Sequence, residues 1–327
     1  MNPQHIEGPG SLLRSSWSLF KAHWHSLAVM VAIPVVLNYI GTLFIGTQES
    51  MAMIFGFIVI VAAIIVSILM SIAVLRSVIM VSSDSNARIS VIGQYQEALP
   101  YFWSFLLVSI ISGLILLGSF ALFIIPGIIV GVYVAFNLNA LIVDGKKGFS
   151  AILESYSLVR GRWMDVFGRL LMLALVNFGV YIVVVILNVG FSYISGVNID
   201  ALHAHQQIPL GLSLVGFVIN LAVQAFVAPF SIIYSYKLYQ SLKSSRQADV
   251  STVVFKRWSI AFMIIGPVMV IFFVVASAAF VAFEISRTQS QLHMQLSDPQ
   301  FQARLEKALQ EQASQKAAQA ASSSVSH

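Results

Sequence analysis

Residues 101–143 read YFWSFLLVSIISGLILLGSFALFIIPGIIVGVYVAFNLNALIV and contain no Asp, Glu, Lys or Arg. A membrane-spanning helix needs about 20 mostly apolar residues, so this run is long enough for two crossings. Pro126-Gly127 is the expected turn, because proline favours the start of a helix and glycine tolerates tight geometry. We therefore expect one span over Tyr101–Ile125 and the next over Pro126–Val143.

The rest of the chain continues this pattern. Of its 327 residues, 58% are hydrophobic and 9% are charged, whereas a soluble domain carries about 25% charged residues. The apolar runs do not alternate with polar residues, which excludes a membrane β-barrel. The sequence predicts an all-α integral membrane protein: a six-transmembrane-helix core plus a seventh transmembrane helix. The other expected spans are Trp24–Gly46, Met51–Met80, Met164–Tyr193, Pro209–Tyr236 and Trp258–Phe283.

The cationic residues are segregated between the spans. They lie before the first span, between the second and third, between the fourth and fifth, and between the sixth and seventh, whereas the loops at 47–50 and 194–208 contain no Lys or Arg. Cations mark the cytoplasmic side, so we expect a cytoplasmic N-terminus and an extracytoplasmic C-terminus. The cationic residues then face the anionic inner leaflet. The net charge of +5 therefore needs no nucleic-acid partner to explain it.

A repeated register precedes three of the outward spans. Segments 11–24, 90–103 and 150–163 each begin with Ser and end with Trp thirteen residues later. Apolar positions recur within them at helical spacing, which predicts amphipathic helices on the cytoplasmic surface. The stripe begins at Leu13, Ile92 and Ile152. The tryptophans that would anchor the interface are Trp24, Trp103, Trp163 and Trp258.

Segments 11–24, 90–103 and 150–163 together would form a collar at the membrane surface, and this collar has two interpretations. An aromatic belt that holds helix depth is the simpler one. The alternative is a surface that binds lipid or a protein partner. If the collar is functional, Leu13→Glu, Ile92→Glu and Ile152→Glu together are expected to impair function while leaving insertion intact.

Residues 124–159 carry a recognisable pattern, IIPGIIVGVYVAFNLNALIVDGKKGFSAILESYSLV. A Pro-Gly-Ile turn opens a short span, and an acidic residue, a glycine and a Ser-containing helix follow. The pattern resembles an uncharacterised family of bacterial inner-membrane proteins related to the membrane domain of glycerophosphodiester phosphodiesterases. The matching positions are Pro126, Gly127, Ile128, Asp144, Gly148, Ser155, Ser157, Tyr234 and Tyr239.

The resemblance covers roughly 11–243 and implies a multi-pass protein of the bacterial cytoplasmic (inner) membrane. The phosphodiesterase domain of about 250 residues is absent, since no polar stretch here could fold it. We expect a six-span domain over 1–243, then a cytoplasmic loop and the seventh span over 244–283. Residues 284–327 should form an extracytoplasmic tail, partly helical from Asp298-Pro299 and then disordered.

No catalytic constellation accompanies these spans. Phosphate-binding loops, His-Glu-x-x-His and Gly-x-Ser-x-Gly are missing, and His23/His25 and His203/His205 lack the further ligands of a metal site. The chain contains no cysteine. We therefore expect no enzyme activity, no cofactor and no metal. The span centres lack ionisable residues, which disfavours a proton relay.

Uncharged polar and small residues remain as candidates within the spans. Asn137 and Asn139 should point to different sides of one helix, while Asn220 and Gln224 share a face. Interhelical hydrogen bonding and a substrate site are both open for these four side chains. Gly127 and Gly131 form a Gly-x-x-x-Gly pair, which packs helices within one chain or between chains.

The function that these features favour is a non-enzymatic membrane or envelope organising or accessory protein that binds lipid or a partner protein. Self-association or partner binding would use the collar or the C-terminal tail. The alternative is a transporter or translocator of a lipid-like or neutral small solute, which would use kinked spans and the Asn and Gln side chains.

Overall fold

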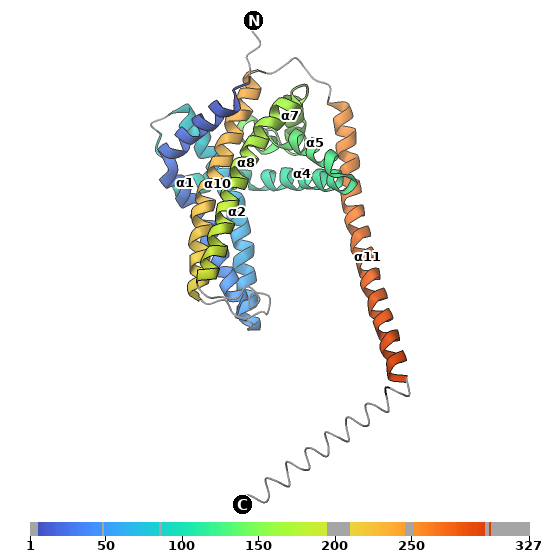
Figure 1. The fold of residues 1–327 in the computed structure, drawn as a ribbon. Helices are drawn as coiled ribbons and strands as arrows, with labels where there is room; N and C mark the ends of the chain where they lie inside the picture. Colours follow the sequence, from blue (N-terminus) through green and yellow to red (C-terminus); the bar gives the residue numbers. More distant parts are fainter. Residues whose placement is uncertain are drawn as a thin grey trace, which may run out of the picture. The chain divides into compact units, whose positions relative to one another are not determined.

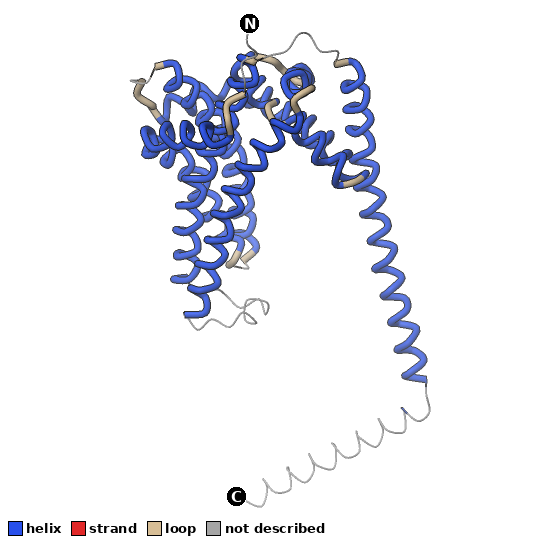
Figure 2. Tube along the Cα trace, turned by 45° about the horizontal axis from the view of Figure 1, so that its top comes forward, coloured by secondary structure: helices blue, strands red, loops and turns tan. Residues whose placement is uncertain are grey.

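The computed structural model describes residues 6–47, 49–84, 87–194, 210–245, 252–297 and 301. These ranges form helices joined by short loops, without a strand among them (Figures 1 and 2). Seven of the described helical segments are long and apolar enough to cross a membrane. The predicted all-α polytopic membrane fold is confirmed. The candidate spans are Pro9–Ile45, Ser50–Ser83, Val91–Leu122, Ile124–Asp144, Trp163–Phe191, Ser213–Ser244 and Val253–Ser290.

The individual elements subdivide some of these spans. In chain order they are α1 (Pro9–Ile45), α2 (Ser50–Ser83), α3 (Val91–Ala98), the 3-10 turn η1 (Leu99–Tyr101), α4 (Phe102–Leu122), α5 (Ile124–Val134), α6 (Asn137–Asp144), α7 (Phe149–Val159), α8 (Trp163–Ile194), α10 (Leu210–Ser244) and α11 (Val253–Ser297).

The chain forms two compact units, Met1–Pro267 and Val268–His327. The first unit extends beyond residue 243, where the six-span domain was expected to end, and includes the first part of α11. In the second unit, α11 continues to Ser297 with exposed apolar side chains such as Phe272 and Phe280. The predicted tail helix from Asp298, apart from Phe301, and the His203/His205 pair lie outside the described residues.

Glycine allows a close approach of α1 and α2, and α1 also packs on α10. A Cβ on Gly41 would lie 2.6 Å from the Ile60 Cγ1, and one on Gly56 would lie 2.7 Å from the Gly41 carbonyl oxygen. Such distances require residues without side chains, as in other close membrane-helix crossings. The α1–α2 pairing therefore depends on Gly41 and Gly56.

α1 is kinked at His23 and carries a proline farther along. His23 has non-helical dihedrals, φ −125° and ψ 15°, one residue before the predicted start of the first span at Trp24. Before this kink, Leu12, Ser16 and Phe20 form the buried face. Pro34 lies farther along α1 and removes one backbone hydrogen bond.

α4 and α5 form an antiparallel hairpin that runs crosswise to α8 and α10 (Figure 1). The hairpin turns at Phe123, whose backbone is extended (φ −163°, ψ 158°), three residues before the predicted turn at Pro126. Proline fits anywhere in the first turn of a helix, because those N–H groups have no intrahelical acceptor. Pro126 therefore marks the start of α5, and the turn itself lies upstream.

The fourth predicted span is interrupted between α5 and α6. The Ser155 hydroxyl of α7 donates to the Tyr133 carbonyl (2.6 Å) and accepts from the Phe136 backbone N–H (3.1 Å). Broken helices are tolerated at membrane depth when neighbouring groups satisfy the freed backbone. One buried serine thus bonds both sides of the interruption.

The first part of α11 packs on α4, α5 and α7 within the first unit. Phe255 stacks on Tyr156 with ring centroids 4.0 Å apart, in a cluster that includes Ile115. Close approach of α4 and α11 again uses glycine, because a Cβ on Gly266 would lie 2.7 Å from the Gly118 backbone nitrogen. Apolar burial and small residues hold this contact.

Candidate functional site

Six of the Asn and Gln side chains within the spans form two groups, while Asn188 donates to the Val184 carbonyl of its own helix. In the first group each asparagine is paired with a serine on another helix. The Asn139 side chain of α6 donates to the Ser235 hydroxyl of α10 at 3.0 Å. The Asn177 side chain of α8 donates to the Ser231 hydroxyl, also in α10, at 3.1 Å.

Asn137 completes this group by donating to the Ser112 hydroxyl of α4. Asn137 and Asn139 are both buried and bond to different helices, the arrangement expected from their spacing. Interhelical hydrogen bonds of this kind contribute about 0.6–2 kcal/mol each. Asn137 and Asn139 are therefore engaged in holding α4, α6 and α10 together.

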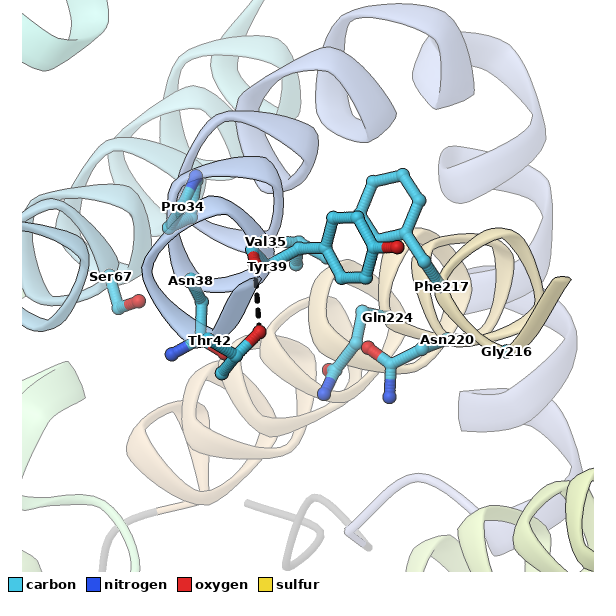
Figure 3. Close-up of a pocket in the computed structure, with 10 residues that line it drawn as sticks. All are labelled: Pro34, Val35, Asn38, Tyr39, Thr42, Ser67, Gly216, Phe217, Asn220 and Gln224. Atoms are coloured by element: carbon cyan, nitrogen blue, oxygen red, sulfur yellow. Dashed lines mark hydrogen bonds between the residues drawn. The ribbon is translucent and has the colours of Figure 1, made fainter. Parts of the chain in front are cut away.

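The second group lines a cleft of about 390 Å³ between α1, α2 and α10 (Figure 3). Asn220 and Gln224 lie on α10, and Asn38 lies opposite on α1. All three are exposed, and their carboxamides have no hydrogen-bond partner among the described residues. The lining residues are Pro34, Val35, Asn38, Tyr39, Thr42, Ser67, Gly216, Phe217, Asn220 and Gln224.

An aromatic pair bounds the cleft. Tyr39 of α1 and Phe217 of α10 stack with centroids 4.3 Å apart, and the Tyr39 hydroxyl lies 3.2 Å from the Ser213 hydroxyl. Thr42 donates to the Tyr39 carbonyl at 2.7 Å within its own helix (Figure 3). The described lining thus combines carboxamide, hydroxyl and aromatic groups and carries no formal charge.

The sequence indicated part of this cleft. Asn220 and Gln224 were expected on one face, and they line the same cavity. The sequence did not identify Tyr39, Ser67 or Phe217 as neighbours, because single residues on three separate apolar helices share no local pattern. The one local signal missed was the four-residue spacing of Asn38 and Thr42 on α1.

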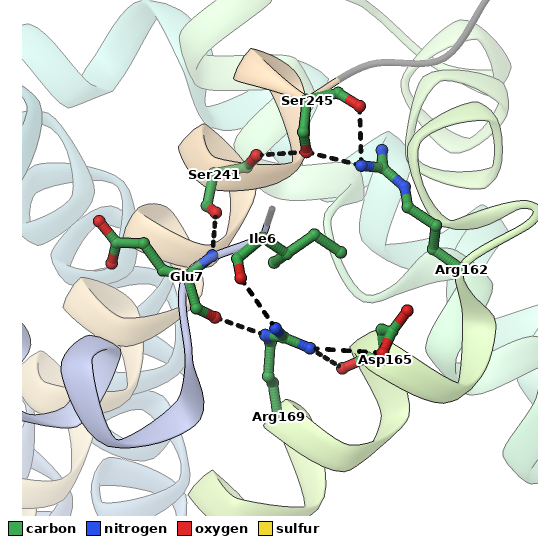
Figure 4. Close-up of polar contacts among 7 residues, drawn as sticks. All are labelled: Ile6, Glu7, Arg162, Asp165, Arg169, Ser241 and Ser245. Atoms are coloured by element: carbon green, nitrogen blue, oxygen red, sulfur yellow. Dashed lines mark hydrogen bonds and ion pairs between the residues drawn. The ribbon is translucent and has the colours of Figure 1, made fainter. Parts of the chain in front are cut away.

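A polar network joins the chain's N-terminal segment to α8 and α10 (Figure 4). Arg169 donates to the carbonyls of Glu7 (2.8 Å) and Ile6 (3.1 Å), and the Glu7 backbone N–H donates to the Ser241 hydroxyl (2.9 Å). These groups bond to each other rather than lining a cavity, so the network serves to join the segments.

Arg162 caps two helices in the same region. Its guanidinium donates to the carbonyls of Leu158 in α7 (3.3 Å), Leu242 in α10 (3.2 Å) and Ser245 (2.8 Å). The last carbonyls of a helix lack intrahelical donors, and a cation there also suits the helix dipole. Burial lowers the pKa of Arg162 because it disfavours the charged form, and Asp165 partly opposes this shift.

Asp144 contacts two side chains of α10. Its carboxylate accepts from the Tyr239 hydroxyl at 2.5 Å and forms an ion pair with Lys243. These contacts tie the end of α6 to α10. Asp144 and Tyr239, two positions of the resembling pattern, thus contact each other.

The three collar segments are not equivalent in space. Ile92, Leu99 and Trp103, around α3, are 72%, 56% and 75% exposed. In α7 the matching positions Ile152 and Val159 are fully buried. The same register therefore faces away from the protein in α3 and into the core in α7. Ile152→Glu would place a charge in that core, so the triple glutamate variant would also destabilise the fold and does not isolate the surface role of the collar.

The interfacial tryptophans divide in the same way. Trp24, Trp103 and Trp258 are exposed, as an interfacial anchor requires. Trp163 instead donates its indole N–H to the Ile129 carbonyl at 3.2 Å and stacks on Phe167. Trp163 is thus held by α5 and by its own helix.

The predicted glycine pair lies inside the α4–α5 hairpin. A Cβ on Gly127 would lie 2.3 Å from a Phe120 ring carbon of α4, whereas one on Gly131 would only touch Leu116 at 3.7 Å. Gly127 thus packs within the chain. Among the described residues, no group of three His, Asp or Glu side chains could hold a metal ion.

Comparison of the chain with protein-family models, with curated proteins and with solved structures finds no match. The chain is a multi-pass membrane protein by its seven apolar helices. The resemblance to the phosphodiesterase-associated membrane domain stays a prediction.

Proposed function

We propose that this protein is a non-enzymatic protein of the bacterial inner membrane that binds an uncharged lipid-like molecule through its polar headgroup. The observation that carries the proposal is the cleft between α1, α2 and α10, which presents three unpaired carboxamides within apolar spans. An amide left without a hydrogen bond in an apolar medium costs several kcal/mol. A ligand with hydroxyl or amide groups would satisfy these side chains.

The chemistry of the lining defines the ligand class. The described lining offers donors and acceptors from Asn38, Asn220 and Gln224, with hydroxyls from Thr42 and Ser67, but no cation for a phosphate and no carboxylate for an amine. A volume of about 390 Å³ is at the lower end for small-molecule sites. It suits a glycerol, sugar or amide headgroup whose acyl chains stay in the bilayer.

The segregation of the cations supports a cytoplasmic N-terminus, with the cleft in the outward halves of α1 and α10. An organising role would consist of retaining such a lipid and presenting it to a partner protein. Translocation is the second candidate, favoured by the prolines inside two spans, Pro34 in α1 and Pro229 in α10, which weaken their helices. Kinked helices accommodate bending.

Because the chain has no cysteine, a single introduced thiol can test the cleft. Ser67→Cys places the thiol in the lining, and Thr47→Cys places a control thiol on the exposed loop between α1 and α2. We would measure maleimide modification in nanodiscs of phosphatidylcholine alone or supplemented with a monoglycosyl diacylglycerol, diacylglycerol or phosphatidylglycerol. An uncharged lipid should slow modification at 67 and leave modification at 47 unchanged.

Equal rates at Ser67→Cys in all lipids would contradict the binding proposal, as would protection by phosphatidylglycerol alone. Vesicles with a labelled form of the protecting lipid then separate the two candidates. Protein-dependent movement between leaflets would support translocation. Protection without movement would support retention and presentation.

A further inference from the structure

α3 is an eight-residue helix with two different faces. Gln94, Tyr95 and Ala98 form the inner face against the bundle, with Gln94 and Ala98 buried and Tyr95 half-buried. Ile92, Gln96 and, directly after α3, Leu99 lie on the opposite face, exposed. This outer face, apolar except for Gln96, has no covering element among the described residues.

The outer face continues directly into α4. Trp103, Leu107 and Ile110 are all exposed and follow Leu99 at spacings of four, four and three residues, which is one helical stripe. α4 belongs to a charge-free segment long enough to cross a membrane. Because its exposed stripe would face hydrocarbon, the surface continuous with it on α3 fits the bilayer rather than a soluble partner.

The inner face reaches the proline kink of α1. Pro34 has no backbone N–H, so the carbonyl four residues earlier, on Met30, lacks its intrahelical donor. The Tyr95 hydroxyl donates to that carbonyl at 2.7 Å. One hydrogen bond from α3 thus occupies the position that the kink leaves open.

A second contact keeps α3 on the bundle. Arg76 of α2 bonds to Glu97 of α3 at 2.6 Å, and its guanidinium lies 5.1 Å from the centroid of the Tyr101 ring. Beyond Pro34, α1 carries Asn38 and Thr42 into the cleft. A change of helix direction at Pro34 would therefore change how these side chains face α10.

We propose that α3 is a bilayer-contacting lever: its outer face rests in the membrane, and the Tyr95–Met30 hydrogen bond transmits its position to the Pro34 kink. Moving α3 changes the bend of α1 and with it the cleft. The lever itself requires no ligand. Its role in regulating ligand binding rests on the function proposed above.

Spin-label distances test the lever without any ligand. In the cysteine-free chain, Leu43→Cys reports on α1 beyond the kink, Val29→Cys reports before it, and Leu175→Cys on α8 is the common reference; all three side chains are exposed. Leu43 lies nine residues beyond Pro34, so a 20° change of the kink moves it by about 5 Å.

We expect Tyr95→Phe, which removes only the hydroxyl, to shift or broaden the 43–175 distance distribution by several ångströms and to leave the 29–175 distribution unchanged. Ile92→Asn should produce the same change by weakening the bilayer contact. Tyr181→Phe is the matched control, because Tyr181 is an exposed tyrosine of α8. Leu99→Asn repeats the test two turns along if Ile92→Asn does not insert.

An unchanged 43–175 distribution in Tyr95→Phe would overturn the proposal, because the hydrogen bond would not set the kink. A change in Tyr95→Phe without one in the outer-face variants would also overturn it, because the bilayer would not move α3. Both outcomes are independent of whether the cleft binds a lipid, so a failure of the lever and a failure of the proposed function remain distinguishable.

Discussion

At the scale of single residues, the Asn and Gln side chains within the spans differ in whether another helix supplies a hydrogen-bond partner. Asn137, Asn139 and Asn177 bond to serines, whereas Asn38, Asn220 and Gln224 face a cleft. In the sequence these side chains look alike. Sorting them requires the positions of Ser112, Ser231 and Ser235, which are ordinary residues of other helices. Sequence reasoning therefore identified Asn220 and Gln224 as candidates together with residues that have a purely structural place.

Ser155 gives a sharp test at this scale. Ser155→Ala removes the partner of the Tyr133 carbonyl and of the Phe136 N–H, and each buried group left unsatisfied costs about 1–3 kcal/mol. We expect a clear loss of unfolding free energy, measured by denaturant titration in detergent micelles. Ser157→Ala is the matched control in the same helix, because Ser157 donates only to the carbonyl of Glu154 one turn earlier. Equal stability of the two variants would contradict the structural role of Ser155.

At the scale of elements, apolar length predicted the spans well, because hydrocarbon thickness requires long charge-free helices. It did not predict which face of a collar helix is covered. An apolar stripe can be covered by the protein core, as at Ile152, or by lipid, as proposed for Ile92. The sequence pattern is the same in both cases, so it does not show which of them covers the stripe. The interruption after Val134 was also invisible, since it depends on a serine nineteen residues later than Phe136.

The α4–α5 hairpin yields a prediction about depth. At its turn Phe123, Ile124 and Ile125 are 75%, 71% and 70% exposed, and three such side chains in water would forfeit the gain from apolar burial. We expect this turn to lie in hydrocarbon. A single Phe123→Cys should resist a membrane-impermeant maleimide added from either side of intact vesicles and react only after detergent is added.

Thr47→Cys is the matched control on the loop between α1 and α2, which should be labelled from the extracytoplasmic side; Thr47 is exposed in the structure. Labelling of Phe123→Cys at the rate of Thr47→Cys would place the hairpin turn in water. In that case the third and fourth segments would cross the bilayer completely, as the sequence predicted.

At the scale of the whole molecule, the groups that hold the protein together differ from the groups proposed to bind a ligand. The paired asparagines, Ser155, Arg162 and the glycine crossings belong to the first kind. The cleft belongs to the second, and α3 is proposed to link it to the bilayer surface. A protein that uses this design needs no charged residue at the centre of its spans, in agreement with its sequence.

The most direct test of this separation compares alanine variants in the two polar groups. Native mass spectrometry would count the lipid retained by each protein released from nanodiscs, and unfolding would be measured in the same preparations. Asn139→Ala should lose about 0.6–2 kcal/mol of stability and keep its lipid. Asn220→Ala with Gln224→Ala should keep its stability and lose the lipid. The reverse pattern, or equal lipid retention in both proteins, would contradict the account.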